Sequence, residues 1–435
     1  MLAAGFAVRV AFIALADQSA LTFHSGGSDA PSYVLLAQNL LARAGFTYAG
    51  LPSAVRPPGY PILVAGLMLI FGDKYILGIR SLQFALGIAT VAICAATGRH
   101  LFGDRAGRLT LLIGLFLPTL IFTTAQVLTE CLAAFLTAIF LRSLILQYAR
   151  KDSRSAWTMG WTAGIEAMIR FNAAALPLFA GIAIWKSMVP RGFKSLTIAL
   201  GIPLLIVLPW LIRNEIAFDC EVLYSTQGGP NAVQGVLTSE GRTRPGDSET
   251  LRKNLGWELH QIETNDLSRL LLPSEAALDR RAIAIVPDLW KRQHWHVFPL
   301  LIKKLADFWL SMDQLAGTTS LAAPERGIRF AGVLAYWAVL VLAILGWSTL
   351  RRTNEPVAAM LFVYAAGFTL LHLPLVMNTR LRIPLLEPLL VILAGAGWMR
   401  LSQTWTGRWG LADAAIDPGA TTFIAPRSLP VSDSR

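Results

Sequence analysis

Long apolar runs separated by short polar connections dominate the sequence. A helix that crosses the hydrocarbon core of a bilayer needs ~20 predominantly apolar residues, with ~17 near the lower limit. On this criterion the pattern predicts ten membrane spans, at about residues 2–17, 75–97, 106–123, 127–148, 156–169, 172–189, 195–213, 328–349, 357–373 and 383–400. We therefore expect an all-α polytopic membrane protein.

The composition supports this fold class. Of the 435 residues, 54% are hydrophobic and only 15% are charged, whereas soluble domains usually carry about 25% charged residues. The cysteines Cys94, Cys131 and Cys220 include no CxxC pair, so neither a disulfide framework nor a zinc site is expected. The net charge of +11 sits mostly in short connections and forms no basic soluble face, which argues against nucleic-acid binding.

The basic connections orient the chain. They are Arg99/Arg105/Arg108, Arg150/Lys151/Arg154, Lys186/Arg191/Lys194, Arg351/Arg352 and the tail with Arg400 and Arg408. With ten spans all five fall on one side, and the positive-inside rule makes that side the cytoplasm. The run 60–72 is too short to span and is expected to be a re-entrant or interfacial helix. Basic clusters at both ends of 156–189 require a hairpin, whose outer turn is Arg170-Phe171-Asn172.

The first apolar run has a competing interpretation. Ala14-Leu15-Ala16 resembles a signal-peptidase site, but the segment lacks a basic head and is interrupted by Arg9. We favour a short first span. Since almost nothing precedes it, we expect the true start to lie upstream of the assigned one.

Four segments follow from this topology. We expect a catalytic membrane module at 1–213 with its first outer loop at 18–74, and an extracytoplasmic, mostly helical loop domain at 214–327. The last membrane helices occupy 328–402, and the proline-containing cytoplasmic tail 403–435 is expected to be disordered.

Ionisable residues at membrane depth are functional candidates, and here they collect at the predicted outer ends of the spans. They are Asp29, Arg56, Glu130, Arg170, Arg213, Arg380, Arg382 and Glu387, together with the polar residues Asn172, Asn214 and His372. Guanidinium groups bind phosphate bidentately and stay charged, so the arginines are candidate contacts for an anionic lipid head group. Asp29, in a loop that begins a helix, can act as a general base. A base beside a phosphate-binding arginine set indicates group transfer from a lipid phosphate.

Structural roles are the alternatives. Asp29 could merely cap the helix that begins near Pro31, and Arg213 could snorkel to lipid phosphates. Glu166 and Arg170 are spaced for an ion pair within one helix. Glu387 could pair with Arg382 or Arg380, and His372 could be a buried polar group. His294-Trp295-His296 lacks an evident third metal ligand, so packing is the favoured interpretation.

Several short motifs resemble those of the GT-C glycosyltransferases, in the branch of protein mannosyltransferases and the lipid A aminoarabinose transferase. They are Ser28-Asp29-Ala30-Pro31-Ser32-Tyr33 with Leu36-Ala37-Gln38-Asn39-Leu40, Arg56-Pro57-Pro58-Gly59-Tyr60-Pro61, Gln83, Leu101-Phe102-Gly103, Leu128-Thr129-Glu130, Pro209-Trp210-Leu211-Ile212-Arg213-Asn214, Gly228-Gly229-Pro230-Asn231 and Arg380-Leu381-Arg382-Ile383-Pro384. The resemblance covers roughly 5–235 and 325–400. No single motif is specific for this superfamily, but the order of the motifs along the chain is. The motifs do not indicate which sugar is transferred.

The resemblance implies roles for individual residues. Asp29 would be the catalytic base, and Glu130 would help to shape the donor or acceptor site. Arg56, Arg170, Arg213 and Arg382 would contact the polyprenyl phosphate, and Tyr33 and Tyr60 would line the cavity. The family is usually inverting. Where many members have a second acidic residue this chain has Ala30, which leaves Asp29 working alone.

We therefore predict a glycosyltransferase of the plasma (inner) membrane that moves a sugar from a polyprenyl-phosphate donor to a glycan, lipid or protein acceptor. Its site would face the periplasm or exterior, and 214–327 would set acceptor choice. No cofactor is predicted, because no carboxylate cluster is dense enough for a metal, although a divalent metal is not excluded. The alternatives are a flippase or transporter, or a polymerase, of lipid-linked glycans.

Overall fold

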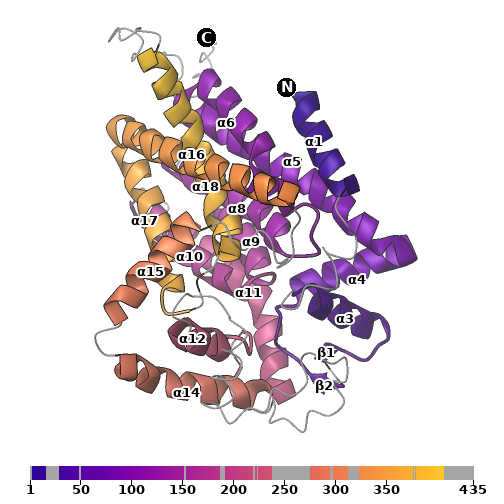
Figure 1. The fold of residues 1–435 in the computed structure, drawn as a ribbon. Coiled ribbons are helices and arrows are strands. Elements are labelled where there is room, and N and C mark those ends of the chain that lie inside the picture. Colours follow the sequence, from indigo (N-terminus) through magenta and orange to yellow (C-terminus); the bar gives the residue numbers. More distant parts are fainter. Residues whose placement is uncertain are drawn as a thin grey trace, which may run out of the picture.

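The computed structural model describes residues 2–15, 29–48, 50–150, 153–186, 192–218, 221–222, 224–237, 275–293, 297–311, 323–375, 377 and 379–405. Helices dominate these residues (Figure 1), which confirms the predicted all-α fold class. The bundle consists of α1 (Leu2–Leu15), α5 (Tyr75–Phe102), α6 (Asp104–Phe116), α7 (Pro118–Phe122), α8 (Glu130–Arg150), α9 (Ser153–Ala167), α10 (Leu176–Lys186), α11 (Gly192–Phe218), α16 (Ala323–Thr353), α17 (Glu355–His372) and α18 (Thr379–Trp405). The other elements are α3 (Ala30–Leu41), β1 (Thr47–Tyr48), β2 (Leu51–Pro52), α4 (Gly59–Phe71), η1 (Gly72–Lys74), η2 (Phe171–Ala175), α12 (Gly228–Leu237), α14 (Glu275–Gln293) and α15 (Val297–Leu310).

The count of ten spans is not confirmed. Among the described residues, six helices are long and apolar enough to cross a membrane, within 59–102, 130–148, 192–218, 331–353, 355–372 and 380–403. Shorter helices occupy the other predicted spans, namely α1, α6 with α7, α9 and α10. The chain is a multi-pass membrane protein.

Two of the short helices have a local cause in the sequence. Pro118 divides the predicted span 106–123, because the residue before a proline disfavours helical backbone angles. Leu117 is accordingly extended (ψ 115°) and separates α6 from α7. The predicted re-entrant or interfacial helix at 60–72 forms as α4, which ends at Gly72 with φ +54° before η1 and α5.

The central helix of the bundle is α18, whose side chains are buried continuously from Arg382 to Gly397. It packs most extensively against α16, and also against α5, α6 and α8. Gly346 of α16 and Gly397 of α18 allow this approach, since a Cβ on either would collide with the carbonyl of Leu393 or Leu342. Small residues at such contacts let membrane helices pack closely.

The smaller elements gather at one end of the bundle, the lower end in Figure 1, which we call the loop end. There α3 packs on α4, and α12 packs on α14. The β1–β2 hairpin is antiparallel, with Thr47 opposite Pro52. In the part of 214–327 that is described, the structure is helical, as predicted.

Several of the predicted cytoplasmic residues meet at the opposite end. Arg105 donates to the Ser402 hydroxyl (3.0 Å) and Arg400 to the Ser348 hydroxyl (2.5 Å), which links α6, α16 and α18. Helix α18 continues to Trp405. The tail after that residue, most of the loop before Glu275 and the His294-Trp295-His296 motif lie outside the described residues.

Candidate active site

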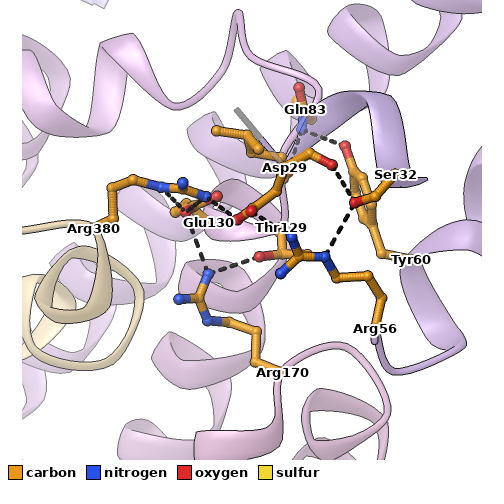
Figure 2. Close-up of polar contacts among 10 residues, drawn as sticks. Asp29, Ser32, Arg56, Tyr60, Gln83, Thr129, Glu130, Arg170 and Arg380 are labelled. Atoms are coloured by element: carbon orange, nitrogen blue, oxygen red, sulfur yellow. Dashed lines mark hydrogen bonds and ion pairs between the residues drawn. The ribbon is translucent and has the colours of Figure 1, made fainter. Parts of the chain in front are cut away.

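Five predicted site residues converge at the loop end, as Figure 2 shows: Asp29, Arg56, Glu130, Arg170 and Arg380. They come from the start of α3, the loop before α4, the start of α8, the turn after α9 and the start of α18. These segments are far apart in sequence and belong to both the N-terminal and the C-terminal parts of the chain. Three guanidinium groups and two carboxylates give the cluster a formal charge of +1.

Asp29 joins the two sides of the cluster. Its Oδ1 lies 2.5 Å from Arg56 Nη2, and its Oδ2 lies 2.9 Å from Arg380 Nη2. The Asp29 side chain makes no capping hydrogen bond to α3, although the residue occupies the N-cap position. Burial opposes ionisation of Asp29, but the nearby positive charges of Arg56 and Arg380 outweigh it and lower the pKa of the carboxyl below its ordinary value.

Arg56 is held in place by its neighbours on both sides. Its Nε donates to the Ser32 hydroxyl (3.1 Å), and its guanidinium lies 5.5 Å from the centroid of the Tyr33 ring. Three residues later, the Gly59 amide donates to the Met168 carbonyl (2.7 Å). A Cβ at Gly59 would lie 2.6 Å from that oxygen, so the position requires glycine. This contact places the loop that carries Arg56 beside the turn that carries Arg170.

Glu130 is the buried carboxylate of the cluster, with its side chain 2% exposed. Its Oε1 accepts from Arg380 Nε (2.9 Å) and lies 3.4 Å from Arg170 Nη1, which also donates to the Thr129 hydroxyl (2.7 Å). Glu130 Oε2 is buried without a hydrogen-bond partner in the described structure. An unpaired buried carboxylate oxygen is costly.

The two predicted cavity tyrosines, Tyr33 and Tyr60, pack against each other beside the cluster. Their rings meet edge to face with centroids 5.0 Å apart, and both side chains are buried. Gln83 donates to the Tyr60 hydroxyl (3.2 Å) and to the Leu128 carbonyl (2.9 Å), which fixes the chain just before Glu130. The sequence motifs contained Ser32, Gln83 and Thr129, but nothing in the sequence assigned them these partners.

The structure places Arg213 apart from the cluster, and its predicted phosphate contact stays a prediction. Its guanidinium donates to the carbonyls of Phe46 (2.7 Å) and Ser53 (2.9 Å) and lies over the Trp210 ring, 5.0 Å from the centroid. The donors of this arginine are thus directed at the backbone of the first predicted outer loop. Arg213 joins α11 to that loop and is not part of the cluster.

Arg382 also lies apart from the cluster, with its side chain fully buried inside the bundle, and its predicted phosphate contact stays a prediction. It donates to the Phe308 carbonyl (2.5 Å), lies 3.4 Å from Glu387 Oε1 and covers the Tyr336 ring at 3.9 Å. Glu387 in turn accepts from the Thr119 hydroxyl. Of the two partners considered for Glu387, the structure selects Arg382, in a structural ion pair.

Two other structural alternatives are resolved. Glu166 accepts from the Thr137 hydroxyl (2.8 Å) and forms no ion pair with Arg170, which is directed at Glu130. His372 is a buried polar group, which is the structural role considered for it from the sequence. Its Nδ1 lies 2.7 Å from the Phe368 carbonyl and its Nε2 lies 2.9 Å from Asn172 Nδ2. The carbonyl must accept from Nδ1–H, so Nε2 accepts from Asn172 and the ring is neutral.

No group of three or more His, Cys, Asp or Glu residues within the described ranges could hold a metal ion. The absence applies to these residues alone. The expected independence of a metal therefore stays a prediction.

Comparisons with known proteins show a partial family match and a similar fold. The family model described as dolichyl-phosphate-mannose-protein mannosyltransferase matches residues 55–212. The oligosaccharyltransferase AglB from Archaeoglobus fulgidus, solved with an inhibitory peptide and a dolichol-phosphate, is similar in structure with a TM-score of 0.52 at 12% identity. That match covers 95% of this chain and 51% of AglB, so the chain spans about half the length of AglB.

Two further comparisons complete these findings. ArnT from Cupriavidus metallidurans, bound to undecaprenyl phosphate, gives a TM-score of 0.41 at 18% identity, over 92% of this chain and 78% of that chain. No curated protein matches the chain. The family model matches residues 55–212, and the similarity to AglB shows a shared fold; both agree with the resemblance that the sequence motifs indicated.

Proposed function

We propose that the chain transfers a sugar from a polyprenyl-phosphate donor to an envelope glycan, lipid or protein acceptor, with inversion at the sugar. The observation that carries this proposal is the cluster in which Asp29 lies between Arg56 and Arg380, with Glu130 and Arg170 beside them (Figure 2). The family model is named for a lipid-phosphate sugar donor, and AglB was solved with dolichol-phosphate. Both support this donor class.

The transfer is a single displacement. An acceptor hydroxyl or amine attacks C1 of the sugar, and Asp29 takes the proton that the acceptor loses. The bond between C1 and the phosphate oxygen breaks, and the polyprenyl phosphate leaves with the bonding electrons. The leaving group gains negative charge as the bond breaks. The guanidinium groups of the cluster stabilise this charge without reorganisation, because they already lie where the phosphate is proposed to bind.

The arginines divide this task. Arg56 and Arg380, whose side chains are 22% and 25% exposed, can reach a phosphate on the accessible side of the cluster. Arg170, 10% exposed, is the deeper contact. Glu130 orients Arg380 and Arg170 through Oε1, and its Oε2 accepts from a substrate hydroxyl. In the present structure Asp29 is bound by the same guanidinium groups that the phosphate would use.

The orientation of the chain in the membrane is part of the proposal. We propose that the loop end faces the periplasm or exterior of the plasma (inner) membrane and that 214–327 sets acceptor choice. The basic residues at the opposite end support this orientation.

The experiment is a transfer assay with protein purified in detergent, a polyprenyl-phosphate sugar, and no nucleotide or membrane gradient. We expect release of polyprenyl phosphate and a product with inverted anomeric configuration. Arg56→Ala should weaken donor binding. A protein that binds the donor but releases no phosphate with any acceptor preparation would favour the transporter, and retained configuration would exclude the single displacement.

A further inference from the structure

Two residues shortly before Arg56, Ser53 and Ala54, are buried and bound by other segments of the chain. Ser53 and Ala54 have no exposed surface. The Ser53 carbonyl accepts from Arg213 (2.9 Å), and the Ser53 amide donates to the Phe46 carbonyl (3.1 Å). The Ala54 carbonyl accepts from the Thr226 amide (3.1 Å). This stretch of loop is therefore bound by other segments through its backbone, as a strand in a sheet would be.

One side chain of the predicted loop domain contributes the charged part of this contact. Glu275, the first residue of α14, accepts from the Ser53 hydroxyl at Oε1 (2.7 Å). Its Oε2 accepts from the Ala54 amide (2.9 Å) and from the Thr226 hydroxyl (3.0 Å). Hydrogen bonds to a charged acceptor are roughly twice as strong as neutral ones. Glu275 thus joins α14, the 224–227 segment and the loop.

Apolar packing fixes Glu275 itself. The next residue, Ala276, is buried in a cluster with Leu36, Ala54 and Trp210. This cluster includes residues of α3, whose N-cap is Asp29, and of α11, which carries Arg213. Glu275 therefore cannot be displaced without disturbing the contact between α14 and the elements that carry the candidate site.

We propose that Glu275 is a positioning residue of the donor site. By holding Ser53 and Ala54, it fixes the backbone two residues before Arg56, while Gly59 fixes the chain three residues after it. The predicted loop domain would then influence donor binding as well as acceptor choice. This inference rests on the proposed function, in which Arg56 binds the donor phosphate.

The test compares Glu275→Ala with Asp279→Ala. Asp279 is a second carboxylate on α14, one turn later, which accepts from the Gly229 amide (2.6 Å) and joins α14 to α12 and not to the first predicted outer loop. It is therefore a matched control for general loosening of α14. Three quantities are measured on the full-length protein in detergent: the Kd of a polyprenyl-phosphate sugar, kcat at saturating donor, and hydrogen exchange of the Ala54 and Val55 amides.

Glu275→Ala should raise the donor Kd by about 10- to 100-fold, because small misplacements of binding groups have effects of this order. It should also accelerate amide exchange at Ala54, while kcat at saturating donor changes much less. Asp279→Ala should leave all three quantities near those of the parent. Glu275→Gln should restore donor binding, since its amide oxygen can accept from the Ala54 amide and its NH2 can donate to the Ser53 hydroxyl.

Three results would overturn the proposal: an unchanged donor Kd in Glu275→Ala, an equal loss in Asp279→Ala, or a Glu275→Gln variant as impaired as the alanine. Failure of the proposed function looks different. In that case Arg56→Ala would bind the donor normally, although Glu275→Ala would still accelerate exchange at Ala54.

Discussion

Replacing Asp29 with asparagine tests its proposed role as a base, because loss of the base should lower kcat without lowering donor affinity. Asparagine keeps the size of the side chain but cannot take up the acceptor proton. General-base catalysis contributes roughly 10²–10⁴ to the rate. We therefore expect kcat of Asp29→Asn to fall by about 10²- to 10⁴-fold.

The donor affinity of Asp29→Asn should not fall along with its kcat. The substitution raises the formal charge of the cluster from +1 to +2 and releases Arg56 and Arg380 from their present partner. The Asp29 side chain is 26% exposed, and ion pairs at this exposure contribute about 0.2–1 kcal/mol. Each pair that no longer competes with the donor phosphate can therefore lower the donor Kd by at most about fivefold.

The assay measures kcat from released polyprenyl phosphate at saturating donor, and Kd from binding without acceptor. Ser32→Ala is the control, because the Ser32 hydroxyl bonds Arg56 Nε and the Asp29 carbonyl but leaves the carboxylate in place. Loss of one such hydrogen bond is worth about 1 kcal/mol, or about fivefold. Near-normal turnover of Asp29→Asn at matched protein levels would refute the base. A parallel loss of donor affinity would make Asp29 a binding residue.

Three further outcomes follow. The arginines lower the pKa of Asp29, so kcat/KM should not decline on acidification until below about pH 3.9, the ordinary value. Arg56→Ala should raise that pKa and move the acid limb of the pH profile upward, and an unmoved limb would contradict the assignment. Arg382→Ala leaves its buried carboxylate partner unpaired, so thermal unfolding in detergent should show a loss of about 3–5 kcal/mol; weaker donor binding without lost stability would contradict this structural role. In a background lacking the native cysteines, an impermeant thiol reagent should label Leu51→Cys, at an exposed turn of the loop end, in intact cells with a permeable outer barrier, and should not label Arg352→Cys. The reverse pattern would invert the topology.

Hydropathy was sufficient to predict where helices form, because each predicted span is occupied by one or two helices. It was not sufficient to predict their lengths. The run at 106–123 is continuous in hydropathy, but Pro118 divides it, and the signal for that break was present in the sequence. The run at 357–373 ends where predicted, at a polar residue, His372.

The positions of the candidate site residues were predicted in part, and the different positions of Arg380 and Arg382 have one physical cause. The positive-inside rule predicts which end of a span a residue occupies, but not which face of the helix it is on. Arg380 and Arg382 were expected in a loop before a span that began at residue 383. Helix α18 instead begins at Thr379, and residues two apart on a helix do not share a face. Arg380 therefore reaches Asp29, while Arg382 is directed into the bundle.

Arg56 and Arg380, the two more exposed arginines of the cluster, each lie close in sequence to residues that buried contacts hold in place. These contacts help to keep the two like charges close together. Arg380 precedes Arg382, which is fixed by Glu387 and the Phe308 carbonyl. Arg56 follows the segment that Glu275 fixes. Restraint of the backbone beside each site arginine limits how far the two guanidinium groups can move apart, and their shared ion pairs with Asp29 hold them together. Supporting contacts of this kind are what preorganised sites require, and here they come from α15, α18 and α14, outside the segment 55–212 that the family model matches.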